Sequence, residues 1–183
     1  MKTVFVDVDT QIDFLFPAGA LYVPGAERIL GAISELNQKA PLLISTMDAH
    51  SEDDPEFRVY PHHCVAGTTG QQKPAGSLLE KRAVIPAATE GVRQFIVEKQ
   101  KLDCFTNPHL LPLLDQLNAD RYVVYGVVTE ICVRFAAFGL LKTGQRVEIV
   151  TDAVRALNEP AARKMFDEFT AVGGKLVKLR DLV

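Results

Sequence analysis

Cys132 is the residue whose type and position best suit covalent chemistry. It follows the apolar run YVVYGVV at 122–128, which predicts a buried strand, and it falls in the first turn of the helix expected next. Unpaired N–H groups and the positive end of the helix dipole favour a thiolate there. We therefore expect a nucleophile, and position alone leaves a buried core cysteine as the alternative.

Two charged residues complete a chemical unit around Cys132. Asp9 directly follows the strand predicted at Thr3–Val8, and Lys99 follows the strand QFIVE at 94–98. A carboxylate can take the thiol proton, and a lysine can keep that carboxylate ionised. An aspartate and a lysine two residues away, Asp7 and Lys101, compete for these roles. The set predicts a nucleophile, a base and an orienting cation without histidine.

A second group of residues has the composition of a metal site. Asp48 and His50 stand two apart after another predicted strand, and Glu56 and His63 follow in a long loop. Two imidazoles with two carboxylates suit Zn²⁺, Mn²⁺ or Fe²⁺. The neighbouring His62 is the alternative histidine ligand, and a surface turn with solvent-exposed histidines is the alternative to a metal site.

The elements that must position these residues are short apolar runs alternating with helical spacings. Strands are predicted at 3–8, 41–46, 83–86, 94–98, 122–128, 146–150 and 175–179, and helices at 25–39, 110–118, 130–141 and 159–172. The alternation predicts a single α/β domain over residues 1–183, with a mostly parallel central sheet in a three-layer α/β/α sandwich. Groups that follow the strands then meet at one sheet edge. The segment 47–79 has no period, which is typical of a functional loop.

Composition excludes several classes of function. Lys and Arg number 20 against 23 Asp and Glu, so no basic surface for nucleic acid is expected. No apolar run approaches the length of a membrane span, and the N-terminus does not resemble a signal peptide. The three cysteines are odd in number and contain no CxxC pair, which indicates free thiols in the cytoplasm.

The chain resembles the isochorismatase-like cysteine hydrolases, and within them the nicotinamidase/pyrazinamidase branch. Four motifs carry the resemblance in the family's order: DTQIDF at 9–14, TMDAH at 46–50 with YPHHCVAGTTG at 60–70, EKQKLDCF at 98–105, and GVVTEICV at 126–133. Their spacing selects Asp9, Lys99 and His63 over the neighbouring candidates. The resemblance covers nearly the whole chain.

The resemblance implies a role for each matched position. Asp9, Lys99 and Cys132 match the family's catalytic triad. The peptide between Val127 and Val128 matches a cis bond, which would direct the N–H groups of Val128 and Cys132 toward a substrate oxygen as an oxyanion hole.

The resemblance further implies a bound divalent ion, zinc first and manganese or iron as alternatives. Many nicotinamidases carry a third histidine where this chain has Glu56. The implied metal ligands are Asp48, His50, Glu56 and His63, and the implied substrate-binding residues are Phe14, Tyr60 and Val128. For the two aromatic residues, a place in the core is the alternative.

The implied activity is hydrolysis of nicotinamide, or a close heteroaromatic amide such as pyrazinamide, to the acid and ammonia through a cysteine thioester. Another cysteine amidase acting on an aliphatic or carbamoyl amide is the first alternative. An isochorismatase-type hydrolase and a non-catalytic binding member are weaker ones. The resemblance also implies a homo-oligomer.

Asp7, Asp13 and the other cysteines are expected to be structural. Asp7 lies in an apolar strand, and because a buried unpaired carboxylate is costly, it should have a hydrogen-bond partner. Residues two apart on a strand share a face, so Asp7 and Asp9 could both point toward the same side. Asp13 is expected to form structural hydrogen bonds, and Cys64 and Cys104 to be inert.

Overall fold

The central sheet has seven strands, all parallel, in the order β3-β4-β2-β1-β5-β6-β7. This computed structural model describes residues 1–87 and 90–182. The strands are β1 (Thr3–Val8), β2 (Leu43–Asp48), β3 (Arg82–Val84), β4 (Gln94–Lys99), β5 (Arg121–Val127), β6 (Arg146–Arg155) and β7 (Lys175–Val177). The apolar runs predicted as strands form the buried centre of this sheet, because a parallel sheet is covered on both faces.

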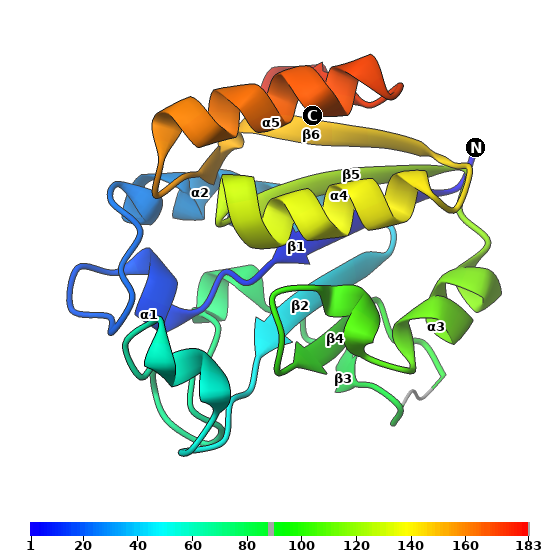
Figure 1. The fold of residues 1–183 in the computed structure, drawn as a ribbon. Helices are drawn as coiled ribbons and strands as arrows, with labels where there is room; N and C mark the ends of the chain where they lie inside the picture. Colours follow the sequence, from blue (N-terminus) through cyan, green and yellow to red (C-terminus); the bar gives the residue numbers. More distant parts are fainter. Residues whose placement is uncertain (88–89, 183) are drawn as a thin grey trace.

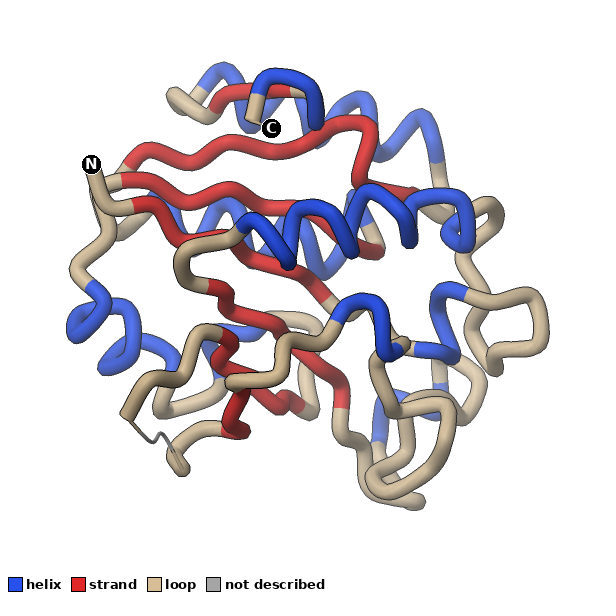
Figure 2. The backbone as a smooth tube through the Cα atoms, turned by 180° about the vertical axis from the view of Figure 1, so that it is seen from behind, coloured by secondary structure: helices blue, strands red, loops and turns tan. Residues whose placement is uncertain are grey.

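Helices cover both faces of the sheet and complete three layers. The helices are α1 (Ile12–Leu15), α2 (Leu30–Lys39), α3 (Leu110–Leu117), α4 (Arg134–Leu141) and α5 (Glu159–Ala171). Figure 1 shows α4 in front of β5 and β1, and Figure 2 shows α2 on the opposite face. The helix α5 packs on the α4 side, where Phe138 and Phe169 meet edge to face at 5.6 Å between ring centroids. The predicted α/β sandwich is confirmed. No helix of the described segments has the length and apolarity that crossing a membrane requires.

Several element boundaries differ from the prediction. A π-helical turn, η5 (Thr129–Val133), precedes α4, so the α-helix predicted from residue 130 begins only at Arg134. A 3-10 turn, η1 (Ala26–Ile29), likewise opens the helix predicted from residue 25. The strand β6 continues five residues past the predicted end at Val150. The loop after β2 contains only the short 3-10 turns η2 (Pro55–Arg58) and η3 (Ala75–Ser77), as expected for a segment without periodicity.

Asp7 and Asp9 lie on opposite faces of the sheet, contrary to simple strand alternation. Asp7 accepts a hydrogen bond from Ser45 at 3.2 Å, whereas Asp9 accepts one from Thr46 at 2.6 Å, and successive β2 residues point to opposite faces. Asp9 follows the end of β1 and has a φ of +49°. Strand alternation holds only while the backbone stays extended, so this left-handed residue turns its side chain to the other face.

The close approach of β1 and β5 beside the site depends on Gly126. Its φ is +119°, and a Cβ at this position would lie 2.1 Å from the carbonyl oxygen of Val8. Only glycine fits both conditions. The glycine of the GVVTEICV motif therefore lets the strand that leads to Cys132 pack directly against the strand that leads to Asp9.

Candidate functional site

The three residues predicted as a catalytic unit meet at the carboxyl edge of the sheet. Lys99 Nζ lies 2.9 Å from Asp9 Oδ2 and 3.9 Å from Cys132 Sγ. Thr46 Oγ1 donates to Asp9 Oδ1 at 2.6 Å, which fixes the rotation of the carboxylate. All three side chains are buried, so their charges interact with little screening by water.

The Cys132 thiol is less acidic than its position in the sequence predicts. Burial raises the pKa of Cys132 well above its usual value, the charge of Lys99 opposes this rise, and the charges of Asp9 and Asp48 add to it. This direction is opposite to the expected preference for thiolate, and its largest cause is the loss of hydration on burial. A base must remove the proton, and Asp9 is the candidate, because its carboxylate lies 2.9 Å from the same Lys99 ammonium group that lies 3.9 Å from the sulfur.

Lys99 carries its charge inside the protein. Burial alone would lower the pKa of Lys99, but the neighbouring Asp9 and Asp48 carboxylates oppose burial, and the pKa is raised well above its usual value. Its ammonium group also contacts Asp48, so one lysine joins the triad to the neighbouring group of metal-type ligands. Lys101 is exposed and takes no part in these contacts.

The peptide bond between Val127 and Val128 is cis, as the resemblance implied. Val128 and Cys132 both line one pocket, together with Val127. The Val128 carbonyl accepts the N–H groups of Ile131 and Val133 at 3.1 Å each, which folds the π-helical turn around the thiol. The predicted oxyanion donors thus belong to residues of the same pocket wall.

Asp48, His50 and His63 form a group that could hold a metal ion, and we call these three residues the metal-type group. One ligand atom from each lies within 4.8 Å of the others, and all three residues are buried. Burial raises the pKa of Asp48 to about 6 despite the lowering effect of Lys99. Burial also lowers the pKa of His63, which favours the neutral imidazole that binds metals.

The hydrogen bonds of the two imidazoles fit a metal. Asp54 Oδ2 lies 3.0 Å from His50 Nδ1, and the Pro61 carbonyl lies 2.7 Å from His63 Nδ1. Metal-binding histidines are normally held in this way through the nitrogen that does not bind the ion. The other nitrogen of His50, Nε2, is buried without a hydrogen-bond partner and lies 3.9 Å from Asp48. An unsatisfied buried imidazole nitrogen facing a carboxylate is what a cation would complete.

Glu56 and His62 occupy different places around this group. Glu56 Oε1 is 3.8 Å from His63 Nε2, and Glu56 forms a second possible ligand group with His50 and Asp54. His62 is exposed and stacks on Phe57 at 4.2 Å between ring centroids, outside both groups. The structure therefore brings His63, and not His62, to Asp48 and His50.

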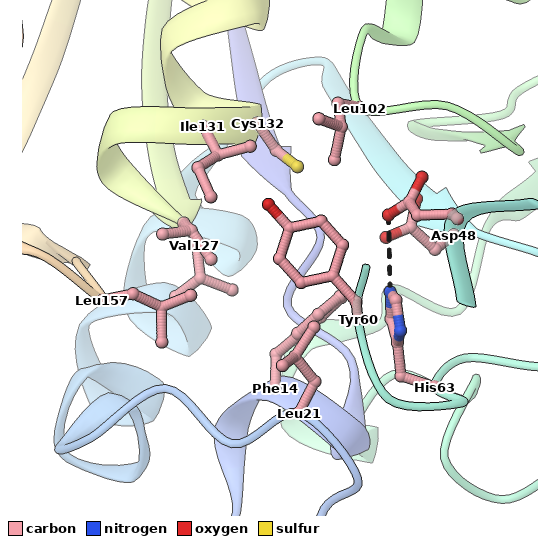
Figure 3. Close-up of a pocket in the computed structure, with 12 residues that line it drawn as sticks. Phe14, Leu21, Asp48, Tyr60, His63, Leu102, Val127, Ile131, Cys132 and Leu157 are labelled. Carbon is pink, nitrogen blue, oxygen red and sulfur yellow. Dashed lines mark ion pairs between the residues drawn. The ribbon is translucent and has the colours of Figure 1, made fainter. Parts of the chain in front are cut away.

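A pocket opens onto Cys132 and the metal-type group. Figure 3 shows the Cys132 sulfur pointing into it, with Asp48 and His63 on one side. The predicted substrate-binding residues line it too, and Phe14 lies 5.4 Å from His63 between ring centroids. The lining residues that sequence reasoning missed are Leu21, Leu102, Ile131 and Leu157. These are ordinary apolar residues, and no local pattern marks them.

Sequence reasoning also missed Asp54 and Gln11. Gln11 donates to the carbonyl of Asp48 at 2.9 Å and accepts from the Asp48 N–H at 2.7 Å, so it fixes the end of β2. Asp54 stands directly before the proline that opens the turn η2. This pattern predicts a cap for the turn, but it does not predict that the Asp54 carboxylate contacts His50. Asp13 is structural as expected, since it accepts the N–H of Cys64 at 2.7 Å.

Comparison with known proteins adds to this geometry. The family model described as the isochorismatase domain matches residues 3–181. The nicotinamidase of Escherichia coli (strain K12) is 24% identical over 210 residues, which cover 95% of this chain and 93% of that protein. The nicotinamidase of Saccharomyces cerevisiae (strain ATCC 204508 / S288c) is 24% identical over 201 residues, covering 87% and 90%.

Solved structures share the fold. The pyrazinamidase of Pyrococcus horikoshii, solved in complex with zinc, has a TM-score of 0.82 and 28% identity, and the likeness covers 97% of this chain and 99% of that one. PnC1 from L. infantum, solved in complex with nicotinate, has a TM-score of 0.85 and 28% identity over 100% of this chain and 95% of that one.

Proposed function

We propose that this chain, which belongs to the isochorismatase family, hydrolyses nicotinamide or a close heteroaromatic amide such as pyrazinamide to the acid and ammonia. Its relatives indicate an amide-hydrolysing enzyme, and the identity of the amide is the part we infer. One observation carries the inference: Cys132 and the Asp48, His50 and His63 group open onto a single apolar pocket that includes two aromatic side chains.

The triad geometry supports a thioester mechanism. Asp9, paired with Lys99, takes the proton of Cys132, and the thiolate attacks the amide carbonyl. The N–H groups of Val128 and Cys132 hold the negative oxygen of the tetrahedral intermediate. Asp9 then returns the proton to the nitrogen that leaves as ammonia, and the acyl group stays on sulfur. Water hydrolyses the thioester with Asp9 as the base again.

Asp48, His50 and His63 would hold a divalent ion, with Glu56 as a further ligand, and zinc is the ion we favour. The ion would supply a Lewis acid on the side of the pocket away from Leu157, where the ring nitrogen of nicotinamide can be held. The protein residues themselves orient the substrate ring. Phe14 and Tyr60 lie beside His63, and their aromatic side chains can pack against the ring of nicotinamide.

An amidase for aliphatic or carbamoyl substrates is the nearest alternative. It would use the same triad but would gain little from aromatic faces beside the metal-type group. The presence of Phe14 and Tyr60 in the pocket therefore favours a flat ring as the substrate.

Ammonia release from nicotinamide tests the substrate. We expect turnover by the zinc-loaded protein, far slower release from acetamide or carbamoyl substrates, and loss of nicotinamide turnover after dialysis against a chelator, restored by added zinc. Zinc-loaded protein that releases ammonia from acetamide and not from nicotinamide would refute the proposed substrate. Undiminished turnover after the metal content has fallen to zero would refute the role of the ion.

Asp54→Asn should weaken zinc binding by about tenfold or more, since residues that hydrogen-bond to the free ring nitrogen of a ligating histidine contribute at that level. The substitution removes the charge that orients His50 through Nδ1 but keeps an oxygen for the Glu56 N–H. Competition with a chromophoric chelator measures the affinity without any substrate. Asp53→Asn, which removes the same charge from the exposed neighbour, is the control and should leave the affinity unchanged. Equal affinities for both variants would contradict the role of Asp54.

A further inference from the structure

The short loop between β6 and α5 forms the wall of the pocket opposite the metal-type group. The loop consists of residues 156–158, and its central residue, Leu157, lines the pocket. Figure 3 shows Leu157 beside Val127, on the side away from Asp48 and His63. Its side chain is 41% exposed, so it stands at the boundary between the pocket and solvent and not in the core.

Glu130 fixes the position of this loop. It lies in the π-helical turn η5, which also contains Cys132. Its Oε1 accepts the N–H of Leu157 at 3.0 Å and the N–H of Asn158 at 2.6 Å. Hydrogen bonds to a carboxylate are stronger than neutral ones, so this double acceptance holds the loop backbone firmly. Glu130 stands two residues before Cys132 in the sequence. The wall of the pocket and the nucleophile are thus tied to each other through one side chain.

The helix that follows the loop has anchors besides Glu130. The Asn158 side chain accepts the N–H of Ala161 at 3.0 Å and caps α5. Farther along α5, Glu168 pairs with Arg134 of α4 at 2.5 Å. Loss of the Glu130 carboxylate would therefore free the backbone at Leu157, while the Asn158 cap and the Arg134 pair still hold α5.

We propose that Leu157 is a specificity-determining residue and that Glu130 is the positioning residue that holds it. A ring bound with its amide at Cys132 and its nitrogen toward Asp48, His50 and His63 presents its opposite edge to Leu157. That edge, C4–C5 of the ring, must be unsubstituted and apolar to fit, so the substrate class is narrowed to carboxamides without a group at C4 or C5. This inference rests on the proposed function.

A pair of substrates that differ at this ring edge tests the proposal. Wild type and Leu157→Ala are compared on nicotinamide and 5-methylnicotinamide, and the ratio of the two kcat/KM values is the readout. One methylene is worth about 10- to 200-fold in such discrimination. We expect Leu157→Ala to raise the relative value for 5-methylnicotinamide by about tenfold or more, chiefly through KM. Leu176→Ala, at an equally exposed leucine of β7, should leave the ratio at the wild-type value.

The Glu130 variants separate positioning from general stability. Glu130→Ala removes both hydrogen bonds and should shift the ratio in the same direction as Leu157→Ala, whereas Glu130→Gln keeps an oxygen that can accept both N–H groups and should not shift it. A ratio that is the same in Glu130→Ala as in wild type would overturn the positioning role. An unshifted ratio in Leu157→Ala would overturn the specificity role.

A readout that needs no substrate distinguishes this proposal from the proposed function. The rates at which iodoacetamide and the bulkier N-phenyl iodoacetamide alkylate Cys132, measured by peptide mass spectrometry, report the width of the pocket. Leu157→Ala should raise the relative rate of the bulky reagent. If wild type releases no ammonia from nicotinamide but this shift occurs, the proposed substrate fails and the role of Leu157 stands. If ammonia is released and neither ratio shifts, the role of Leu157 fails alone.

Discussion

Cys132→Ala is expected to lower kcat for ammonia release from nicotinamide by at least about 10⁴-fold, the scale of loss seen when a covalent nucleophile is removed. The sulfur is the atom that forms the thioester, and in the variant Asp9 has only water to activate. The loss should fall on kcat, because the aromatic and metal-type groups that bind the ring remain in the variant. Initial rates of ammonia release measure the effect, and mass spectrometry of acid-quenched wild type should detect an acyl group on the Cys132 peptide.

Cys104→Ala is the matched control. Cys104 is also a buried thiol, and burial raises its pKa to about 12, but it lies outside the pocket. Its replacement should leave kcat within about threefold of wild type, because the side chain has no part in the chemistry and its loss leaves only a small cavity. Turnover by Cys132→Ala that approaches the wild-type rate would show that another group carries the reaction and would refute the mechanism.

Asp7→Asn is expected to destabilise the protein by roughly 3–5 kcal/mol, because breaking a buried ion pair leaves an uncompensated charge. Asp7 Oδ2 lies 3.2 Å from Lys73 Nζ, and both side chains are fully buried. The predicted partner for Asp7 is thus confirmed, and it is a cation 66 residues away. In Asp7→Asn the ammonium group loses its opposite charge and keeps only neutral acceptors such as the Thr10 hydroxyl, which lies at 2.9 Å.

Lys73→Met should cost less than Asp7→Asn. The carboxylate that remains still accepts hydrogen bonds from Thr10, Asn37 and Ser45 at 2.6–3.3 Å. The double variant has neither charge, so its loss of stability should be clearly smaller than the sum of the two single losses. Urea unfolding of the four proteins at one metal concentration measures this coupling.

An exposed ion pair provides the control for the cycle. Lys39 and Glu35 lie one helical turn apart at 2.9 Å on α2, and such exposed pairs contribute under about 1 kcal/mol. Lys39→Met should change the free energy of unfolding by no more than that. If the Asp7 and Lys73 losses simply add, the two residues do not act as a pair and the interpretation of this ion pair is wrong.

The candidate site could be predicted from sequence because its chemistry lies at the ends of strands. The apolar runs that precede Asp9, Asp48, Lys99 and Cys132 become parallel strands, so these residues meet at one edge of the sheet. Motif spacing further selected Lys99 and His63 from their neighbours, and the structure places both in the expected groups. The catalytic and ligand roles of these residues remain predictions for the experiments above.

Other features could not be predicted because they depend on contacts between distant segments. Leu157 and Glu130 are 27 residues apart, and no periodicity relates them. Asp54 and His50 are close in the chain, but only the fold of the loop turns the carboxylate toward Nδ1. The face of Asp9 could not be predicted, since one residue with a φ of +49° ends the strand alternation on which the inference relied.

The amino-acid sequence by itself determined the sheet, the order of the motifs and the residues able to react, because strand periodicity and residue type are local properties. Only the tertiary structure decided the protonation of Cys132, the pairing of Asp7 with Lys73 and the wall that Leu157 presents. The pKa of a buried thiol reflects the loss of water from all sides and the charges around it. That environment exists only when segments far apart in the chain are packed together.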